Sequence, residues 1–374
     1  MIRILYVAEA LTRNSGVASV ITNLIRNISS ENIKIDLLTY KNGDLLILDE
    51  LRKYGANVYY VPELNLKSLF NFKKAVNEFF KTHRYDIVHS HFNQVDGIVF
   101  KIAKQYGVKV CISHSHNTKL SDSRIKSIRN RLLCYKISEI ADVWAACSEE
   151  AGICLYGRKF SNSNKKLIIH NGVDCSRFKY NDEFRKSIRN EFQVSDSEIL
   201  IGHVGGFRIQ KNHDFLIDIF RELYRCDKKY KLLLVGDGEL KSSIQKKVNN
   251  YGIQDRVIFA GTRTDINKIM SGMDLFILPS LYEGLPVVGI EAQASGLNCI
   301  FSDSITRDVN LTNSMFVNLN EKLDNWCRII ENTDISRHIE YQDMIKSKGF
   351  DIKKECKKIS DLYIDFMKVE RKIK

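Results

Sequence analysis

Apolar runs alternate with amphipathic stretches along the whole chain, and this alternation constrains the fold more than any other feature. Short runs such as IRILYVA and KIDLLTY have the length of buried strands. Between them, VASVITNLIRNI and LFNFKKAVNEFFKTH repeat their apolar residues at helical spacing. Strands that alternate with helices predict parallel sheets covered on both faces. The chain is therefore expected to have an α/β fold with doubly wound parallel sheets.

The alternating pattern occurs twice along the 374 residues, which predicts two domains. The first half has further candidate strands in NVYYVP, DIVHSHF, VKVCISHSH, DVWAACS and KLIIHNGV. The second half has them in EILIGHVGGF, KLLLVGDG, RVIFAGT, DLFILPS and NCIFSD. The polar stretch 174–198 contains no strand pattern and is the expected boundary. We predict domains over residues 1–175 and 176–348, followed by a C-terminal helix over 349–374.

Composition excludes several classes of protein. A hydrophobic content of 44% and a charged content of 27% are typical of globular domains, and no run of 18 apolar residues predicts a membrane span. The N-terminal MIRILYVAEAL is interpreted as a strand and not as a signal peptide. Nine scattered cysteines without a Cys-x-x-Cys pair favour reduced thiols in the cytoplasm. The net charge of +12 favours an anionic partner.

The stretch SLYEGLPVVGIEAQASG, residues 280–296, predicts an anion site. It follows the candidate strand DLFILPS, and we expect its helix to begin with Pro286 and to stop at Gly296. The free N–H groups and the positive dipole end at such a helix start attract phosphate. Glu283 and Glu291 lie on either side of the turn, roughly 10–15 Å apart, about the length of a folded sugar nucleotide. Alternatively, one glutamate simply favours the helix start and the other is solvated.

Ligands of open parallel sheets bind beyond the carboxyl ends of the strands. After the strand ILIGHV, the segment GGFRIQKN places Gly206 beside two cations, Arg208 and Lys211, which suit a diphosphate. After the first strand, Gly16 is expected to open a helix.

Four histidines end two neighbouring candidate strands, His89 and His91 on one, His114 and His116 on the other. Spacing of two residues places each pair on one face of its strand. Four imidazoles can form a metal site, but no Asp or Cys at ligand spacing accompanies them. The favoured interpretation is that one of them makes a polar contact with a ligand and the others are satisfied inside the fold. No Asp-x-Asp pair is present to hold a metal-bound diphosphate, so we expect neither metal nor cofactor.

With these residues in place, the chain resembles a retaining glycosyltransferase of family 4, whose GT-B fold has two facing Rossmann-like domains with a cleft between them. EGLPVVGIEAQASG matches the Glu-x7-Glu motif of that family at Glu283 and Glu291. GGFRIQKN, LLLVGDGEL, VIFAGTRTDI and IIHNGVD recur in the usual order, so the resemblance covers essentially the whole chain. DIVHSHF and ISHSHNT further resemble the branch that builds bacterial capsular polysaccharides and exopolysaccharides. One departure is Ser15-Gly16, where the family often has two glycines.

The resemblance implies that the first domain binds the acceptor, that the second binds the nucleotide-sugar, and that the C-terminal helix over 349–374 crosses back onto the first domain. It also implies a role for each matched residue. Glu283 is expected to contact the donor sugar, Glu291 the ribose, and Arg208 with Lys211 the diphosphate. His114 or His116 is expected to reach the anomeric region of the donor. These histidines, Glu283 and the two cations form the expected catalytic set. The remaining expected donor contacts are Gly16, Gly206, Thr262, Arg263, Gly284, Leu285, Pro286 and Val287.

The expected function is transfer of a sugar, with retention, from a nucleotide-sugar donor to a saccharide or lipid-linked saccharide acceptor. UDP is the expected nucleotide, and bacterial capsule, exopolysaccharide or O-antigen synthesis is the expected process. A sugar-nucleotide 2-epimerase of the same fold and an inactive assembly subunit are the alternatives. A dehydrogenase is disfavoured because no Gly-x-Gly-x-x-Gly follows a strand, and nucleic-acid binding because no binding module is recognisable.

SDSRIKSIRNRLLCYKISEI is a candidate membrane-surface helix. One helical face carries the apolar residues Ile125, Ile128, Leu132 and Tyr135, and five charges come from Arg124, Lys126, Arg129, Arg131 and Lys136. Basic amphipathic helices bind anionic membranes, whereas an ordinary surface helix packs its apolar face on a sheet. The expected location is the cytoplasm, at the inner face of the plasma membrane if this helix binds lipid.

Overall fold

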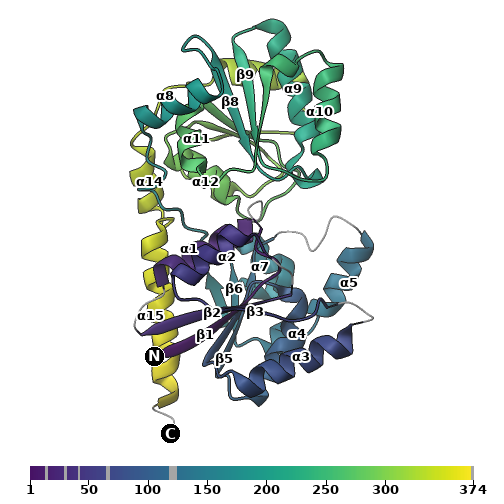
Figure 1. Cartoon of the computed structure of the whole chain (residues 1–374), viewed down its shortest axis with the longest axis vertical. Helices are drawn as coiled ribbons and strands as arrows, with labels where there is room; N and C mark the ends of the chain where they lie inside the picture. The colour runs from purple at the N-terminus through teal and green to yellow at the C-terminus, as the bar shows by residue number, and fades with distance from the viewer. Residues whose placement is uncertain (13–15, 29–31, 41–42, 65–67, 118–123, 372–374) are drawn as a thin grey trace. The chain divides into compact units, whose positions relative to one another are not determined.

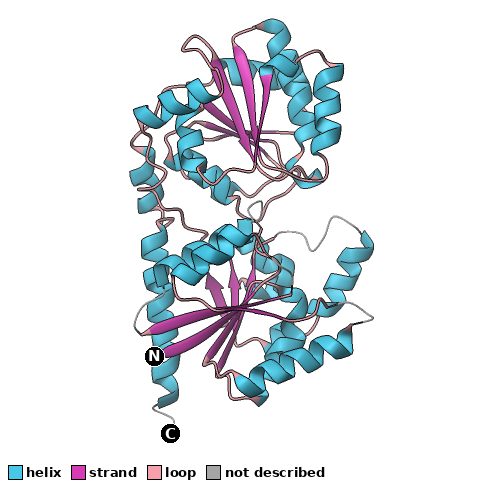
Figure 2. Ribbon diagram, viewed as in Figure 1, coloured by secondary structure: helices cyan, strands magenta, loops and turns pink. Residues whose placement is uncertain are grey.

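Two compact units make up the computed structural model of the chain, which describes residues 1–12, 16–28, 32–40, 43–64, 68–117 and 124–371 (Figure 1). Unit 1 comprises residues 1–172 and 352–374, and unit 2 comprises residues 173–351. Each unit is a parallel sheet with helices on its faces (Figure 2). The predicted α/β class is therefore confirmed. No helix in the described ranges is long and apolar enough to span a bilayer.

Unit 1 has a seven-stranded parallel sheet in the order β3-β2-β1-β4-β5-β6-β7. Its strands are β1 (Ile2–Val7), β2 (Ile33–Thr39), β3 (Val58–Tyr60), β4 (Ile87–Ser90), β5 (Val110–Ser115), β6 (Val143–Ala146) and β7 (Lys166–Ile168). Its helices are α1 (Gly16–Ile28), α2 (Leu45–Lys53), α3 (Leu69–Thr82), α4 (Asn93–Gln105), α5 (Arg124–Cys134), α6 (Ile137–Ile140), α7 (Glu149–Tyr156), η1 (Arg158–Phe160) and α15 (Ile352–Arg371).

The last helix, α15, completes unit 1 although it follows unit 2 in the sequence (Figure 1). It packs against α1 and β1. Cys356, Ile359 and Tyr363, which follow helical spacing, are buried on its inner face.

Unit 2 has a six-stranded parallel sheet in the order β10-β9-β8-β11-β12-β13. Its strands are β8 (Ile199–Val204), β9 (Tyr230–Val235), β10 (Val257–Gly261), β11 (Leu275–Leu278), β12 (Cys299–Ser302) and β13 (Met315–Val317). Its helices are α8 (Asp182–Glu191), η2 (Ile209–Lys211), α9 (His213–Cys226), α10 (Lys241–Asn250), η3 (Gln254–Arg256), α11 (Ile266–Gly272), α12 (Val287–Ala294), η4 (Arg307–Val309), α13 (Leu323–Asn332) and α14 (Tyr341–Ser347). The polar stretch after residue 174 contributes α8, whose cap Asn181 accepts from the Phe184 amide.

In both sheets the strand order reverses direction at one point, between β1 and β4 in unit 1 and between β8 and β11 in unit 2. At such a switch point the loops that follow the two strands diverge, and ligands of open α/β sheets bind there. The fold therefore directs attention to the segments after β1, β4, β8 and β11.

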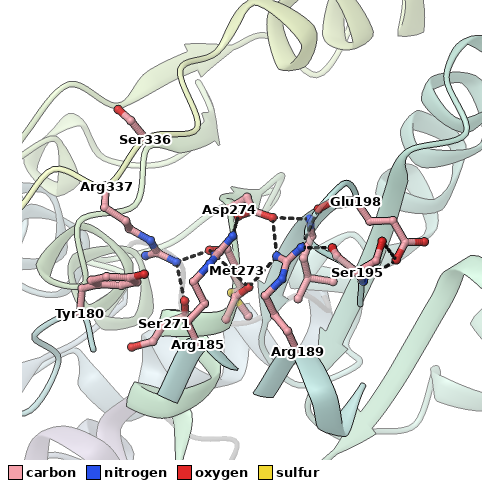
Figure 3. Close-up of polar contacts among 12 residues, drawn as sticks. Tyr180, Arg185, Arg189, Ser195, Glu198, Ser271, Met273, Asp274, Ser336 and Arg337 are labelled. Atoms are coloured by element: carbon pink, nitrogen blue, oxygen red, sulfur yellow. Dashed lines mark hydrogen bonds and ion pairs between the residues drawn. The ribbon is translucent and has the colours of Figure 1, made fainter. Parts of the chain in front are cut away.

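The opposite, amino-terminal end of the unit 2 strands is fastened by a buried ion cluster (Figure 3). Asp274, just before β11, accepts from Arg185 Nη2 at 2.7 Å and from Arg189 Nη1 at 2.9 Å. Its Oδ2 also accepts from the Leu200 amide at 2.7 Å. One carboxylate thus joins α8, β8 and β11 at the edge of the sheet remote from the switch point.

A third arginine of this cluster, Arg337, caps the C-terminus of a helix. Arg337 donates to the carbonyls of Met270 and Ser271, both at 2.9 Å, and to that of Met273 (Figure 3). These carbonyls close the C-terminus of α11, where backbone acceptors lack intrahelical donors. Burial lowers the pKa of Arg337 to about 10, and the guanidinium stacks on Tyr180 at 4.7 Å. The cluster stabilises unit 2, and within the described residues only the Nε atoms of Arg189 and Arg337 in it are buried without a hydrogen-bond partner.

Candidate active site

The loops after β8 and β11 are tied together at the switch point of unit 2. Leu281 N donates to the Gln210 carbonyl at 2.9 Å, and Gln210 Nε2 donates to the Tyr282 carbonyl at 3.0 Å. Asn212, in the left-handed region at φ 55°, donates to the Pro279 carbonyl at 3.1 Å. The loop after β8 therefore fixes the path of the loop that carries Glu283.

Lys211 and Glu283 form an ion pair in this loop cluster. Lys211 Nζ lies 2.7 Å from Glu283 Oε1, and their side chains are 16% and 10% exposed. Gln210 Nε2 donates to the other carboxylate oxygen at 3.2 Å. Two residues predicted to act on the same ligand are thus in contact. The second predicted cation, Arg208, is exposed, and within the described ranges its side chain has no ion pair.

Glycines allow the loops after β8 and β9 to approach each other closely beside the Lys211–Glu283 pair. A Cβ on Gly205 would lie 3.1 Å from the Lys211 side chain, which crosses directly over it. A Cβ on Gly236, after β9, would lie 2.1 Å from the Gly205 carbonyl oxygen, closer than any real contact. Glycine is therefore required at position 236 for close approach of two loops. Gly206 is buried within the same turn.

The helix after β11 begins one residue later than predicted. Pro286 has ψ 101° and is the N-cap, so α12 starts at Val287, and the expectation that Pro286 is the first helical residue is wrong. The proline ring fixes φ but leaves ψ free. The extended ψ of Pro286 places this residue outside the helix, directly before its first turn. Gly296 has φ 76° after the last turn, which confirms the predicted stop. The segment Gly284–Val287 thus places a helix start directly after Glu283.

Glu291, on α12, has an unusual ionisation. Burial raises the pKa of its carboxyl to about 7, and nearby Arg177 lowers it to a smaller extent. The side chain is only partly buried. In the described part of the chain its carboxylate has no hydrogen-bond partner. A desolvated but reachable acceptor of this kind suits the hydroxyl groups of a ligand.

Gln293 was not predicted as important, yet it organises the surroundings of α12. Its Nε2 donates to the Gly289 and Val309 carbonyls at 2.9 and 2.8 Å. Its Oε1 accepts from Leu311 N and Thr312 N, both at 3.0 Å, and from the Thr312 hydroxyl at 2.9 Å. A second polar residue, besides Glu291, in a helix that is otherwise apolar is the signal that could have identified it.

Arg263, expected near the base of a nucleotide, is already engaged. Its Nη2 lies 2.8 Å from Asp265 Oδ2 and 3.2 Å from Glu191 Oε2. These hydrogen bonds raise the pKa of the guanidinium above its ordinary value. Thr262, the residue before it, is partly exposed at the end of β10.

In unit 1 the four histidines lie together, as their spacing predicted. Ring centroids are 4.5 Å apart for His89 and His91 and 4.1 Å apart for His114 and His116. The pairs bond across the strands, with His89 Nε2 to His114 Nδ1 at 3.2 Å and His91 Nδ1 to His116 Nε2 at 2.8 Å. Burial lowers the pKa of His89 to about 3 and that of His116 to about 4, so the rings are neutral.

Three of these histidines are near enough to share a metal ion. Ring nitrogens of His89, His91 and His114 lie within 4.8 Å of one another. Zinc binds neutral imidazole nitrogens at about 2.0–2.1 Å. The residues thus supply the donor type of a trihistidine site, and the absence of a metal cofactor stays a prediction.

Residues of α4 fasten the end of β5 beside the histidines. Asn93 Nδ2 donates to Ser113 Oγ at 2.9 Å and to the His114 carbonyl at 3.2 Å. Burial raises the pKa of Asp96, which accepts from the Ser113 hydroxyl, to about 7. Gly16 opens α1 as predicted and is exposed, whereas Ser15 lies outside the described residues.

The predicted basic helix is α5, which packs on α4 (Figure 1). Its inner face buries Asn130 and Cys134. Ile128, Leu132 and Tyr135 are 64%, 72% and 74% exposed, and Arg129 and Arg131 are exposed as well. The predicted apolar face therefore points away from the sheet, although the side chain of Ile125 lies outside the described set.

Two parallel sheets with Rossmann strand order, each with one switch point, define the class of doubly wound α/β proteins, and an acidic-basic pair and a helix start lie at the switch point of unit 2. Residues 14–177 match the family described as Glycosyltransferase Family 4, and residues 184–309 match Glycosyl transferases group 1. The chain belongs to glycosyltransferase family 4 and has the GT-B fold.

Relatives and a solved structure agree with this assignment. Putative glycosyltransferase EpsF of Bacillus subtilis is 32% identical, covering 88% of this chain and 86% of its own. UDP-Gal:alpha-D-GlcNAc-diphosphoundecaprenol alpha-1,3-galactosyltransferase of Escherichia coli is 27% identical, with 94% of each chain covered. Anabaena HepE, solved in complex with UDP and glucose, has a TM-score of 0.81 at 18% identity, covering 98% of this chain and 100% of that one.

Proposed function

We propose that this glycosyltransferase moves a sugar, with retention of configuration, from a UDP-sugar to a lipid-linked saccharide in bacterial surface polysaccharide synthesis. The observation that carries the proposal is the Lys211–Glu283 pair at the switch point, directly before the start of α12. A cation and a helix start favour a diphosphate, while a carboxylate favours sugar hydroxyls. A relative named for a UDP-galactose donor and a diphosphoundecaprenol acceptor supports the substrate classes.

In the proposed reaction the bond between the anomeric carbon and the diphosphate breaks, and the acceptor oxygen bonds to the same face of that carbon. The departing phosphate takes the acceptor proton. Arg208, Lys211 and the start of α12 stabilise the negative charge that develops on the leaving group. Glu283 orients the sugar, Glu291 accepts from the ribose, and His114 or His116 contacts the anomeric region.

Ligand binding must rearrange the pair, because Lys211 bonds Glu283 in the free protein. A diphosphate offers Lys211 a second anion, and sugar hydroxyls offer Glu283 new donors. Lys211→Met is expected to lower kcat/KM at least a hundredfold while the fold is retained, since charge on the leaving group loses its stabilising cation. Lys241→Met is the matched control, because Lys241 pairs with Asp237 on an exposed surface of the same unit. Equal activity of the two variants would remove Lys211 from the mechanism.

The test of the function uses UDP-sugars and lipid extracts that contain diphosphoundecaprenol-linked saccharides. Acceptor-dependent UDP release, with an α-linkage of the product by NMR from an α-linked donor, is the expected result. A free, altered sugar formed without acceptor would identify an epimerase. Binding of UDP without any turnover would identify an inactive subunit. Transfer that requires added Mg²⁺ would contradict the metal-independent mechanism.

We further propose that α5 holds the enzyme on anionic membrane, where a lipid-linked acceptor resides. Its outward apolar residues and exposed arginines have the composition of an interfacial helix. Leu132→Glu is expected to weaken sedimentation with anionic vesicles at low salt about tenfold or more. Leu45→Glu is the matched control, because both leucines are 72% exposed. The same loss in both variants, or no binding by the wild type, would refute this role.

A further inference from the structure

A line of four hydrogen-bonded side chains crosses the core of unit 1. The Tyr6 hydroxyl on β1 lies 3.0 Å from the Tyr363 hydroxyl on α15. The Tyr363 hydroxyl lies 2.6 Å from His89 Nδ1, and His89 Nε2 lies 3.2 Å from His114 Nδ1. All four side chains are 0% exposed, so water does not interrupt the line.

The number of protons in this line is fixed. Burial lowers the pKa of both His89 and His114, and it raises that of both Tyr6 and Tyr363. Each histidine is therefore neutral with one N–H, and each tyrosine keeps its O–H. Four donors serve three hydrogen bonds, so one donor of the line is left over.

The leftover donor depends on the direction of the bonds. If Tyr6 donates to Tyr363, Tyr363 to His89 Nδ1, and His89 to His114 Nδ1, the unused donor is His114 Nε2–H. If every bond is reversed, the Tyr6 hydroxyl has no acceptor in the described part of the chain, and His114 Nε2 becomes an unused acceptor. The first direction leaves one buried group unpaired and the second leaves two, which is the costlier arrangement.

We propose that Tyr363 is a positioning residue that donates its proton to His89 and so holds His114 as the neutral Nε2–H tautomer. His114 then offers its ligand a hydrogen-bond donor and not a base. The ligand group it takes is an oxygen acceptor, such as a sugar hydroxyl or a phosphate oxygen. This step rests on the proposed function, in which one of two histidines contacts the donor sugar, and it favours His114 for a donating role.

The same arrangement argues against His114 Nε2 as a metal ligand. A metal needs the lone pair of a ring nitrogen, and in the favoured direction that nitrogen carries the proton. Zinc bound through His114 Nε2 would have to displace the proton on that nitrogen. Zinc bound through Nδ1 would break the bond to His89.

The first experiment reads the tautomers directly, by ¹⁵N chemical shifts of histidine ring nitrogens in the full chain without ligand. Resonances are assigned with His89→Asn and His114→Asn. In the wild type we expect Nε2–H at both histidines. Tyr363→Phe should produce a mixture of tautomers at His89 and His114, because His89 Nδ1 loses its donor. Tyr6→Phe removes an equally buried hydroxyl but leaves the Tyr363 donor, so Nε2–H should persist.

Several results would overturn the proposal. These are Nδ1–H at His114 in the wild type, an unchanged tautomer in Tyr363→Phe, or the same mixture in both tyrosine variants. Stoichiometric zinc binding with loss of the His114 Nε2 proton would overturn it too. If Tyr363→Phe fails to fold, the wild type and Tyr6→Phe still decide the direction of the bonds.

Turnover supplies a second, separable readout. With an active UDP-sugar pair, Tyr363→Phe is expected to lower kcat about tenfold and to change the donor KM by less than about twofold, since the lost interaction acts in the transition state. Nε2–H in the wild type without any transferase activity would leave the positioning role intact and refute the proposed function. Transferase activity together with Nδ1–H at His114 in the wild type would support the proposed function and refute the positioning role of Tyr363.

Discussion

Glu291 gives the sharpest quantitative prediction, because its ionisation opposes folding. Its pKa is raised from 4.5 to about 7 by burial, so between these values the folded chain holds a proton that the unfolded chain has lost. The free energy of unfolding therefore falls as pH rises from about 4.5 to about 7. At 1.36 kcal/mol per pKa unit the loss reaches about 3 kcal/mol, and partial solvent access reduces it to about 1–3 kcal/mol.

Glu291→Gln keeps the shape of the side chain and removes the charge. The variant is expected to be more stable than the wild type by about 1–3 kcal/mol at pH 8 and equal to it near pH 4. For a unit of 179 residues, from 173 to 351, this corresponds to a rise in Tm of roughly 2–12 °C at pH 8. Differential scanning calorimetry from pH 4 to pH 8 measures both the size and the pH window.

The same substitution should weaken nucleotide binding, because a charged acceptor for the ribose hydroxyls is replaced by a neutral amide. UDP affinity at pH 8 is expected to fall about tenfold or more. Glu331→Gln, on an exposed site of α13, is the control and should change neither property. A Glu291→Gln variant less stable than the wild type at pH 8, or a difference independent of pH, would refute the reasoning.

Two further substitutions test the packing around the site. Asp274→Asn should lower the free energy of unfolding of unit 2 by about 3–5 kcal/mol in urea denaturation, because Arg189 is left buried without its partner. A loss below 1 kcal/mol would show that the cluster is not a stabilising element. Gln293→Leu should cost about 2–4 kcal/mol in the same assay, since the amides of Leu311 and Thr312 lose their acceptor. An unchanged free energy of unfolding in Gln293→Leu would mean that water replaces the glutamine oxygen as the acceptor.

Much of the fold could be predicted because its strands are buried on both faces. Most strands from β1 to β12 are rich in apolar residues, which local sequence makes visible, although β1, β2, β7 and β9 each include a lysine or an arginine. The exception is β13 (Met315–Val317), whose three residues lie between the polar residues of TNS and NLN and pair with β12. β3 and β7 are equally short, but they lie within the longer runs NVYYVP and KLIIHNGV, which make them visible in the sequence.

The candidate site could be predicted in part, for a topological reason. Residues after the strands converge because the carboxyl ends of parallel strands share one edge, and this rule selected Arg208, Lys211 and Glu283. The rule gives no distances, so the ion pair between residues 72 positions apart was not predicted. The engagement of Arg263 by Glu191 and the contacts of Gln293 also depend on residues distant in sequence.

The two edges of the sheet in unit 2 differ in how fully their charged side chains are paired, because the carboxyl-terminal edge combines the Lys211–Glu283 ion pair with unpaired charges. At the amino-terminal edge, both oxygens of the Asp274 carboxylate are bonded, so that charge has a structural use. At the carboxyl-terminal edge, Glu291 and Arg208 have no ion pair in the described part of the chain. An unpaired, partly desolvated carboxylate lowers stability unless a ligand supplies the missing donors. On this view Glu291 opposes folding because its carboxylate lacks the donors that ribose hydroxyl groups supply in the complex. The stability that Glu291→Gln gains over the wild type at pH 8 should then disappear when UDP saturates the wild type, since the bound hydroxyl groups replace the water that burial removed from the carboxylate.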